Sequence, residues 1–490
     1  MKDNMIIVNS KDSVAVALCD IKKGEICRYG ALTVTAKDDI PFGHKLALFD
    51  VKEGENVIKY GSPIGHATQN IEKGAYLHVH NIKTNLAESG DYVFRGTQEY
   101  FWNEQDDFFM GYRRKDGRVG VRNEIWIVPT VGCVNKTAER LAKEAEKIGI
   151  KVLAMTHPYG CSQMGEDQTM TQKSLAALVK HPNAGGVLVL SLGCENNNLK
   201  EFQPFLEEYD SERIRFMITQ EEEEEIEKGL AHIKALSHLA EKDKREKIPF
   251  RELIIGFKCG GSDAFSGITA NPLCGCLTDL HTSSGGRAIL TEVPEMFGAE
   301  DSLFVRCESE EVFDQATVMI NEFKNYYVNH NQVVYENPSP GNKAGGITTL
   351  EEKSLGCIQK GGQATVTDVL AYAEQVKKSG LSLLTGPGND MVSCTNLAAS
   401  GAHIILFTTG RGTPFGTVVP TLKISSNSAL AQHKANWIDF NAGVLLEGTS
   451  FEEATKKLME LLKETASGKL AKNEENDYRE IAIFKDGVTL

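Results

Sequence analysis

The sequence lacks any long run of apolar residues, which argues against a helical membrane protein. No stretch approaches the roughly 20 apolar residues that a membrane-spanning helix needs. The opening segment, MKDNMIIVNSKDSVAVALCD, is interrupted by charged side chains and has no signal-peptide cleavage pattern. We therefore expect a cytoplasmic protein with no membrane partner.

Positive charge is also in short supply. The chain has 53 Lys and Arg residues against 67 Asp and Glu residues, which gives a formal net charge of −14, and it shows no concentrated basic stripe. Because nucleic-acid-binding surfaces carry such a stripe, we expect no nucleic-acid partner. An acidic small molecule would need a local cluster of positive groups or a metal ion to receive it.

Several fingerprints of common enzymes are missing as well. The chain has no GxGxxG after its first predicted α/β strand, no GxxxxGK[ST] and no GxSxG. These patterns mark dinucleotide binding, the phosphate-binding P-loop and the nucleophile elbow of α/β-hydrolases. No CxxC pair is present either, so we do not expect a zinc ribbon.

The composition is typical of a large globular protein with reduced cysteines. The 490 residues are too many for one hydrophobic core, and 41% of them are hydrophobic. The eleven cysteines are spread along the chain rather than set in a small disulfide framework, and several stand next to glycine in turns. In a reducing compartment such cysteines are thiols, metal ligands or small packing residues.

The periodicity of apolar residues divides the chain into four parts. Residues 1–88 contain short strands separated by turns such as DIKKGE and DVKEGE, which predicts a small all-β module. Residues 89–110 are acidic and aromatic without a clear period, and we interpret them as a linker. In residues 111–248 and again in 249–490, apolar strands alternate with helices or with glycine-rich turns, which predicts parallel sheets covered on both faces. The predicted fold class is α/β, with a small all-β module followed by a parallel-sheet body in two parts.

Two histidines near the end of the β module are candidate metal ligands. His78 and His80 are two residues apart, and in an extended segment their side chains point to the same side. Two imidazoles placed in this way can bind one divalent ion. The alternative is that they are two half-exposed histidines on a strand.

Polar, glycine-rich turns follow the predicted strands. In open α/β sheets, ligands bind beyond the carboxyl ends of the strands, and glycine lets the backbone approach them closely. Asp263 and Asn196 could instead cap the helices that follow them. Amide and hydroxyl side chains suit a polyhydroxylated ligand, and Arg411 can pair with a carboxylate. The residues that we predict to hold the hydroxyl and carboxylate groups of a substrate are Asn196, Asn197, Ser262, Asp263, Glu292, Asn389, Asp390 and Arg411.

Cysteines at the ends of predicted strands allow another kind of metal centre. Three of Cys133, Cys161, Cys194 and Cys259 could hold an iron–sulfur cluster with one open iron position. Tight turns favour small residues for structural reasons too. We favour a single divalent ion over a cluster.

Longer motifs carry a resemblance to a known family. NVIKYGSPIGHA and HVHNIKTNL resemble the amino-terminal SAF module, a β-clip-like fold, of sugar-acid dehydratases. GRVGVRNEIWIVPTVGCVN, THPYGCSQMGED, CGGSDAFSGITANP and TGRGTPFGTVVPTLKI are similar to the body of the same family, and NEENDYREIAIFKDGVTL extends the likeness to the last residue. This family joins altronate and galactarate dehydratases with the subunits of sulfolactate lyase.

The resemblance implies a hydro-lyase that acts on a small sugar acid. Its expected reaction is the loss of water from D-altronate to give 2-dehydro-3-deoxy-D-gluconate in hexuronate breakdown, and its expected cofactor is Fe²⁺ or Mn²⁺. Galactarate dehydratase or another sugar-acid lyase is the first alternative. A non-catalytic sugar-acid-binding protein is the second, although only three tryptophans could stack on a sugar.

Dehydration of a sugar acid requires a base, an acid and a means of stabilising negative charge. Loss of the proton beside the carboxylate gives an enediolate, which a chelated divalent ion would stabilise. We predict that His78 and His80 ligate this ion and that His44, Lys83 or His157 is the base. A homo-oligomer is compatible with the sequence.

Overall fold

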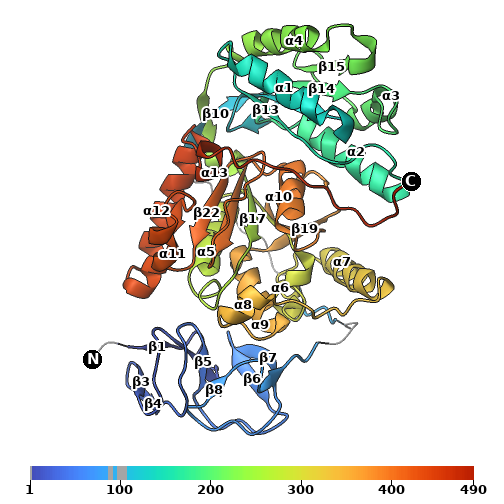
Figure 1. Ribbon diagram of the computed structural model, residues 1–490. Helices are drawn as coiled ribbons and strands as arrows, with labels where there is room; N and C mark the ends of the chain where they lie inside the picture. The colour runs from blue at the N-terminus through green and yellow to red at the C-terminus, as the bar shows by residue number, and fades with distance from the viewer. Residues whose placement is uncertain (1–2, 87–91, 97–106) are drawn as a thin grey trace.

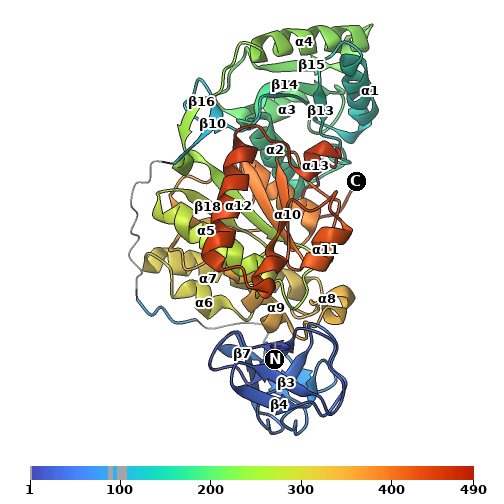
Figure 2. The same cartoon turned by 90° about the vertical axis from the view of Figure 1, so that its left-hand side faces the viewer.

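The computed structural model describes residues 3–86, 92–96 and 107–490 of the chain. Three units follow one another in space: a β module at one end, an α/β body in the centre and a smaller α/β domain at the other end (Figures 1 and 2). We call them the β module (3–86), the body (249–490) and the middle domain (111–248), after the predicted boundaries. Most of the predicted linker, 89–110, lies outside the described residues.

The β module consists of short antiparallel strands joined by tight turns. Its largest sheet has the order β1-β2-β5-β8, and the module also contains the pair β3-β4 and the three-stranded sheet β6-β7-β9. Glycine is needed in the turns, since Gly24 and Gly54 have φ angles of +88° and +83°. The strands are β1 (Met5–Ile6), β2 (Val14–Ala17), β3 (Ile26–Tyr29), β4 (Leu32–Thr35), β5 (Lys45–Ala47), β6 (Asn56–Lys59), β7 (Ser62–Ala67), β8 (Tyr76–Leu77) and β9 (Ile82–Lys83).

The middle domain is built on a four-stranded parallel sheet of order β13-β12-β14-β15. Its helix α4 buries Ile233, Leu236 and Ala240, a spacing of three to four residues that is typical of an amphipathic helix. The elements are β12 (Glu124–Pro129), η1 (Gly132–Val134), α1 (Asn135–Glu146), β13 (Val152–Ala154), α2 (Gly165–Val179), β14 (Ala184–Ser191), α3 (Leu199–Phe202), η2 (Gln203–Leu206), β15 (Ile214–Ile218), η3 (Thr219–Glu221) and α4 (Glu225–Ala240).

The body contains a seven-stranded parallel sheet of order β19-β20-β18-β17-β21-β22-β23. Alternate residues of β21 enter two different hydrophobic clusters: Ile404 and Leu406 pack with helices α5 and α12, whereas Ile405 and Phe407 pack with α10. Both faces of the sheet are therefore covered, as the apolar strands predict. The strands are β17 (Ile254–Cys259), β18 (Arg287–Leu290), β19 (Val366–Leu370), β20 (Gly380–Leu384), β21 (Ile404–Thr409), β22 (Thr421–Ser425) and β23 (Phe440–Asn441).

Helices of the body flank this sheet and extend toward the β module (Figure 1). They are η4 (Phe250–Glu252), α5 (Ala270–Ser283), η5 (Val293–Glu295), α6 (Glu300–Phe304), α7 (Glu310–Asn329), α8 (Pro340–Ala344), α9 (Leu350–Cys357), η6 (Ile358–Gly361), α10 (Asp390–Ala399), α11 (Ser428–His433), η7 (Ala442–Glu447), α12 (Phe451–Ala466) and α13 (Lys472–Glu475). Within the described ranges, no helix combines the length and the apolar character that crossing a bilayer would require. The fold class is thus α/β, as predicted.

Two structural links attach the middle domain to the body. The chain enters it through β10 (Phe108–Arg113) and leaves it through β16 (Glu246–Pro249), and these two strands pair with each other in an antiparallel ladder that also includes β11 (Val119–Gly120). The last residues of the chain then run back along the middle domain (Figure 1), where Arg479 pairs with Glu124 at 2.8 Å.

A buried ion pair attaches the β module to the body. The ammonium groups of Lys45 and Lys59 lie 2.9 and 2.7 Å from the carboxylate oxygens of Glu352 at the start of α9, and all three side chains are at most 1% exposed. The amide of Thr348 also donates to this carboxylate at 2.8 Å. Burial alone would raise the pKa of Glu352, but the two lysines outweigh burial and hold the pKa below its usual range.

We predict that Glu352→Gln destabilises the protein by about 3–5 kcal/mol, because two buried ammonium groups lose their counter-charge. Chemical denaturation of the full chain measures this change. The stabilisation by Glu352 is present above the pKa of an unfolded carboxyl group, about 4.3, and is lost as the pH falls through the lower pKa of the folded state.

The matched control is Asp39→Asn, which breaks the solvent-exposed pair of Lys22 and Asp39 in the same module. No measurable change is expected there. Equal stability of Glu352→Gln and the wild type would show that the ion pair does not hold the module in place.

Candidate functional site

The carboxyl ends of three parallel strands of the body bring charged side chains together. The ammonium of Lys258, the penultimate residue of β17, contacts Glu292 after β18 and lies 3.0 Å from a carboxylate oxygen of Asp390 after β20. The amide of Cys259 donates to Glu292 at 3.0 Å. Glu292 has a left-handed backbone with a φ of +73°, which is rare for a residue other than glycine and is common at functional sites.

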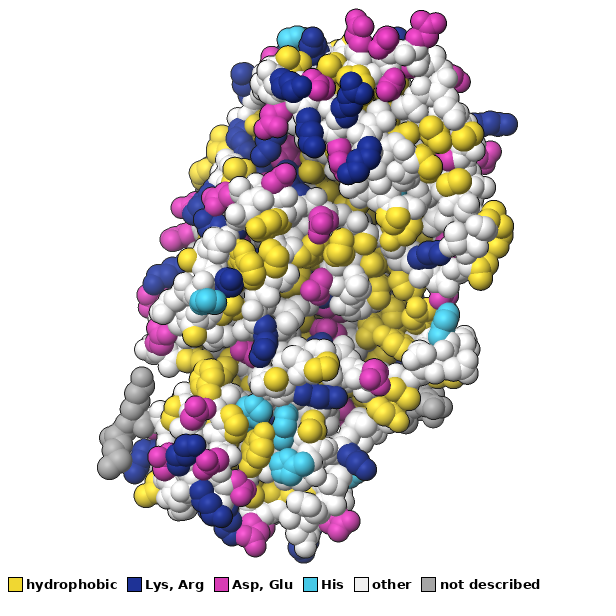
Figure 3. Space-filling view, viewed as in Figure 1, with side chains coloured by type: hydrophobic (Ala, Val, Ile, Leu, Met, Phe, Trp, Pro, Cys, Tyr) yellow, Lys and Arg dark blue, Asp and Glu magenta, His cyan; other side chains and the backbone are white. Residues whose placement is uncertain are grey.

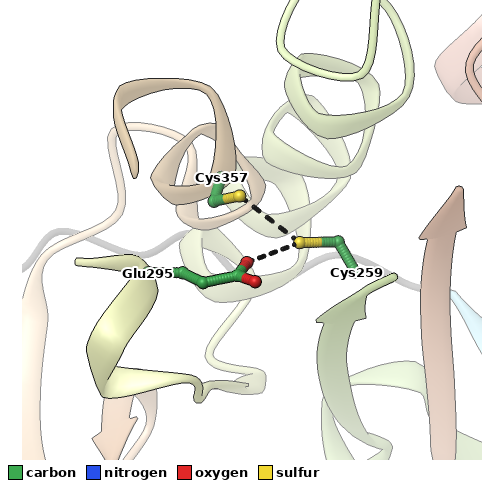
Figure 4. Close-up of side chains that lie close together, drawn as sticks. All are labelled: Cys259, Glu295 and Cys357. Atoms are coloured by element: carbon green, nitrogen blue, oxygen red, sulfur yellow. Dashed lines mark hydrogen bonds between the residues drawn. The ribbon is translucent and has the colours of Figure 1, made fainter. Parts of the chain in front are cut away.

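Two buried cysteines and a carboxylate lie at the centre of this edge. The sulfur of Cys259 is 2.9 Å from a carboxylate oxygen of Glu295 and 3.4 Å from the sulfur of Cys357. Figure 4 shows the three side chains pointing toward one another from the end of β17, from η5 and from α9. The ammonium of Lys360 donates to the Cys259 sulfur at 2.9 Å. We call Lys258, Cys259, Glu292, Glu295, Lys353, Cys357 and Lys360 the strand-end cluster.

Electrostatics favour the thiolate form of Cys259. The hydrogen bond from the Cys357 thiol lowers the pKa of Cys259 to about 6 against the effect of burial, and Lys360 and Lys258 add to the lowering. Burial would raise the pKa of Glu295, but Lys353, whose ammonium lies 2.8 Å away, outweighs it and lowers the pKa. Glu295 opposes the lowering of the Cys259 pKa, because its carboxylate, 2.9 Å from the Cys259 sulfur, favours the protonated thiol as a donor.

The strand-end cluster meets the distance requirement of a metal site but not its charge requirement. Among the described residues, Cys259, Glu295 and Cys357 are the one group of three possible ligands whose ligand atoms lie within 4.8 Å of one another. Lys353 and Lys360 already neutralise their negative charges. A divalent cation would compete with these buried ammonium groups, so the trio fits proton transfer or anion binding better than metal binding.

The backbone of the two predicted metal ligands differs from the prediction. His78 and His80 do not lie on a strand: β8 ends at Leu77, and His78–Asn81 form a turn before β9. The side-chain oxygen of Asn81 accepts a hydrogen bond from the His78 amide at 2.9 Å, and its nitrogen donates to the Tyr76 carbonyl at 2.9 Å. The short amide side chain of Asn81 thus closes a turn where alternation alone predicted an extended segment.

The turn still gathers aromatic and imidazole side chains. The ring of His78 is 4.9 Å from that of His44 and 5.8 Å from that of Tyr76, and the His80 ring is 5.3 Å from Tyr76. The Nδ1 atom of His78 is buried without a hydrogen-bond partner among the described residues. In the space-filling view, histidines gather where the β module meets the body (Figure 3). An unpartnered imidazole nitrogen in such a place suits a metal ligand.

The three predicted bases are in different surroundings. His44 is buried at the module–body contact, with Nδ1 2.7 Å from the Tyr76 hydroxyl and Nε2 3.3 Å from the Ala344 carbonyl, and burial lowers its pKa. His157 lies in the middle domain, where Nε2 donates to Pro129 and Nδ1 accepts from Tyr159. Both ring nitrogens of His157 are therefore used by the backbone. Lys83 is exposed on β9.

The predicted substrate-binding residues fall into two groups. Ser262, Asp263, Glu292, Asn389, Asp390 and Arg411 follow strands of the body, whereas Asn196 and Asn197 follow β14 of the middle domain. Asp263 accepts from the hydroxyls of Ser266 and Ser426 at 2.9 and 2.8 Å, and Asn389 caps α10. The Ser262 hydroxyl is buried without a partner among the described residues. A narrow cavity beside it is lined by residues of both units, including Tyr60, Asp263, Asn271, Lys353 and Cys357.

Sequence reasoning missed Lys353 and Lys360 of the strand-end cluster and gave Cys357 no role. Lys353, Cys357 and Lys360 come from α9 and η6, which no predicted strand of the sheet precedes directly. The sequence does indicate a role for Lys258, because it is a charged residue inside an otherwise apolar strand. Such a lysine is rarely buried without a partner, so it predicts a nearby carboxylate.

Family models match each of the three units of the chain. Residues 250–489 match the C-terminal family model of D-galactarate/altronate dehydratase, residues 111–241 match the second domain of D-galactarate dehydratase/altronate hydrolase, and residues 3–85 match the altronate/galactarate dehydratase SAF domain.

Three curated relatives are similar over nearly their whole length. An altronate dehydratase of Bacillus subtilis is 51% identical over 99% of this chain and 100% of its own. An altronate dehydratase of Escherichia coli is 49% identical over 99% of both chains. A galactarate dehydratase (L-threo-forming) of Escherichia coli is 31% identical over 95% of this chain and 93% of its own.

We predict that Cys259 ionises with a pKa of about 6 and that Lys360→Met raises this pKa by roughly 1 to 3, because the thiolate loses its charged donor. The thiolate absorbance is measured against pH in the wild type and in Lys360→Met, each with and without the additional substitution Cys259→Ser. The difference between the two curves of each pair reports the ionisation of Cys259 alone. Lys136→Met, an exposed lysine on α1, is the matched control. An identical difference titration in Lys360→Met and the wild type would contradict the assigned contact.

Proposed function

Since this chain belongs to the family of D-galactarate and altronate dehydratases, we propose that it is an altronate dehydratase. This hydro-lyase removes water from D-altronate and releases 2-dehydro-3-deoxy-D-gluconate. The observation that carries the assignment is identity of about one half, over essentially the full length, to two altronate dehydratases, against 31% to a galactarate dehydratase. All eleven cysteines are free, which suits a reducing compartment, and we propose a cytoplasmic location.

The contact between the β module and the body is the proposed place of the reaction. His44 meets Ala344 there, and the following Gly345 packs against Asp263. Asp263 in turn packs against Gly410, the neighbour of Arg411. These contacts between the segments that carry His44, Asp263 and Arg411 support a shared site for a hydroxylated acid. Arg411 is exposed and can receive the substrate carboxylate.

His78 and His80 are the proposed ligands of a divalent ion, Fe²⁺ or Mn²⁺. The unpartnered Nδ1 of His78 supports this assignment, and the exposed ring of His80 follows in the same turn. When bound, the ion would supply a Lewis acid for the negative charge that develops on the substrate carboxylate. The strand-end cluster is not proposed as its site because its charges are already balanced.

His44 is the proposed base. Burial lowers its pKa, so the imidazole is neutral at pH 7. The carbonyl oxygen of Ala344, 3.3 Å from Nε2, can only accept a hydrogen bond, so Nε2 carries the ring proton and Nδ1 accepts from the Tyr76 hydroxyl at 2.7 Å. Nδ1 is therefore the basic nitrogen with which His44 would take the proton beside the substrate carboxylate. Tyr76 then acts as a positioning residue that fixes the ring. His157 lies in the middle domain, away from the module–body contact, and Lys83 is exposed on β9, so both are weaker choices.

We predict that the purified protein converts D-altronate to a 2-oxo product and that thorough chelation lowers the rate at least about 100-fold, because Lewis-acid stabilisation amounts to several kcal/mol. Restoring Fe²⁺ or Mn²⁺ should restore the rate. A panel of aldonates and aldarates tests the substrate.

The outcomes of this assay separate the alternatives. Turnover of D-galactarate without turnover of D-altronate would indicate a galactarate dehydratase. Binding of sugar acids without turnover, with either ion supplied, would indicate a non-catalytic binding protein. An undiminished rate in chelated protein would contradict the metal proposal alone.

A second prediction distinguishes ligand from base. His78→Ala and His80→Ala should weaken Mn²⁺ binding, measured by the electron paramagnetic resonance signal of free Mn²⁺. His44→Ala should keep Mn²⁺ binding but lower kcat by a factor of roughly 10²–10⁴. The rate of the wild type should fall as the pH decreases through the pKa of His44, which lies below its ordinary value because of burial.

His66→Ala is the matched control, because His66 is a histidine of the same module that bonds Asn85 at 2.8 Å. It should retain both Mn²⁺ binding and turnover. Full Mn²⁺ binding in both His78→Ala and His80→Ala would rule out the ligand assignment, and a full rate in His44→Ala would rule out the base.

A further inference from the structure

Three Gly-Cys pairs follow three neighbouring strands of the middle domain. Cys133 follows β12, Cys161 follows β13 and Cys194 follows β14, and in the sheet β12 lies between the other two. Because the strands are parallel, all three cysteines lie at the same edge of the sheet. This edge belongs to the middle domain, not to the body that carries the strand-end cluster.

The three loops contact one another directly. The amide of Gly132 donates to the Tyr159 carbonyl at 2.9 Å, and the amide of Asn197 donates to the Gly160 carbonyl at 3.0 Å. A side chain at Gly160 would overlap the carbonyl oxygen of Thr130. Glycine before Cys161 therefore allows an approach between the loops that another residue would prevent.

The exposure of these cysteines is unusual. Only four of the eleven cysteines are exposed, namely Cys19, Cys133, Cys161 and Cys194. Cysteine is one of the most buried residue types, so three exposed thiols on adjacent loops call for a reason other than packing. Cys259, by contrast, is buried against Glu295 and Cys357, which separates it from the other strand-end cysteines.

Buried polar side chains hold the loops in place. His157 bonds the backbone of Pro129 and Tyr159, and Asn135 donates to the His157 carbonyl at 2.8 Å. Glu195 accepts from the Thr130 hydroxyl and the Gly193 amide, both at 2.6 Å. This network connects all three loops without using a cysteine.

The buried side-chain oxygen of Asn197 is a second indication of a binding site at this edge. Asn197 donates to the Thr130 carbonyl at 3.0 Å, which ties the loop after β14 to the loop after β12. Its side-chain oxygen is buried without a partner among the described residues. A rigid edge with free thiols and an unsatisfied polar atom is typical of a prepared binding site.

We propose that Cys133, Cys161 and Cys194 bind an iron–sulfur cluster of the four-iron type. Thiolates are the usual protein ligands of such clusters, and three of them leave one iron open to a non-protein ligand. On binding, each thiol loses its proton and forms one iron–sulfur bond. His157, Asn135, Glu195 and Asn197 position the loops that carry the ligands.

Spacing favours a cluster over a single metal ion. Four sulfur ligands around one tetrahedral ion lie about 3.8 Å apart, given metal–sulfur bonds of about 2.3 Å. The sulfurs of Cys133, Cys161 and Cys194 do not all lie within 4.8 Å of one another, since the one described group that meets this limit is Cys259, Glu295 and Cys357. A cluster bridges wider gaps because each thiolate binds a different iron.

The experiment is anaerobic reconstitution of the full chain with Fe²⁺ and sulfide, followed by assay of iron and acid-labile sulfide. We expect about four irons and four sulfides per chain, with the broad visible absorption of an iron–sulfur protein. Cys133→Ser, Cys161→Ser and Cys194→Ser should each lose most of the sulfide and the absorption. Acid-labile sulfide and the visible absorption are independent of turnover and of the ion proposed at His78 and His80, whereas the iron content includes any iron bound there.

Cys19→Ser is the matched control, because Cys19 is exposed but lies in the β module. It should retain the wild-type content of iron and sulfide. Circular dichroism of the metal-free variants checks that the middle domain still folds. Wild-type protein that takes up no sulfide, or a triple serine variant with undiminished sulfide and absorption, would overturn the proposal.

Discussion

Glu352 holds two lysines of the β module against the body, and the geometry of the module–body contact depends on this buried carboxylate. Lys45 follows His44 in the sequence, and Lys59 precedes Tyr60, which lines the cavity next to the body. Fixing the two ammonium groups therefore also fixes the two side chains beside them. The desolvation of three charges is costly, so the arrangement persists only while all three groups are present.

Helix α9 couples this contact to the strand-end cluster. Glu352 points to the β module, whereas the next residue, Lys353, lies 2.8 Å from Glu295. The same helix ends at Cys357, whose thiol contacts Cys259. Any shift of α9 would disturb both charge networks at once, so the helix joins the module to the chemistry of the sheet edge.

Patterns within single segments predicted the architecture well but the site only in part. The apolar strands correctly predicted the parallel sheets. Because parallel strands end at the same edge of the sheet, Glu292 and Asp390 lie next to Lys258. The turn at His78 was missed because Asn81 bonds two backbone groups, an interaction that competes with alternation. Lys360 was missed, and Cys357 was noted only as a cysteine beside glycine, because long-range packing, not local sequence, brings both to Cys259. The roles of His44, His78 and His80 remain predictions.

The paired strands β10 and β16 give the middle domain the topology of an insertion. The chain leaves and rejoins the rest of the molecule at neighbouring points, with Gly111 opposite Glu246 in the ladder. Hydrogen bonds from the amides of Asp486 and Gly487 to Asp167, at 2.9 and 2.8 Å, provide a second anchorage near the start of α2. A domain tethered at one point can swivel, whereas one tethered at two separate points is restricted to rocking about the line that joins them.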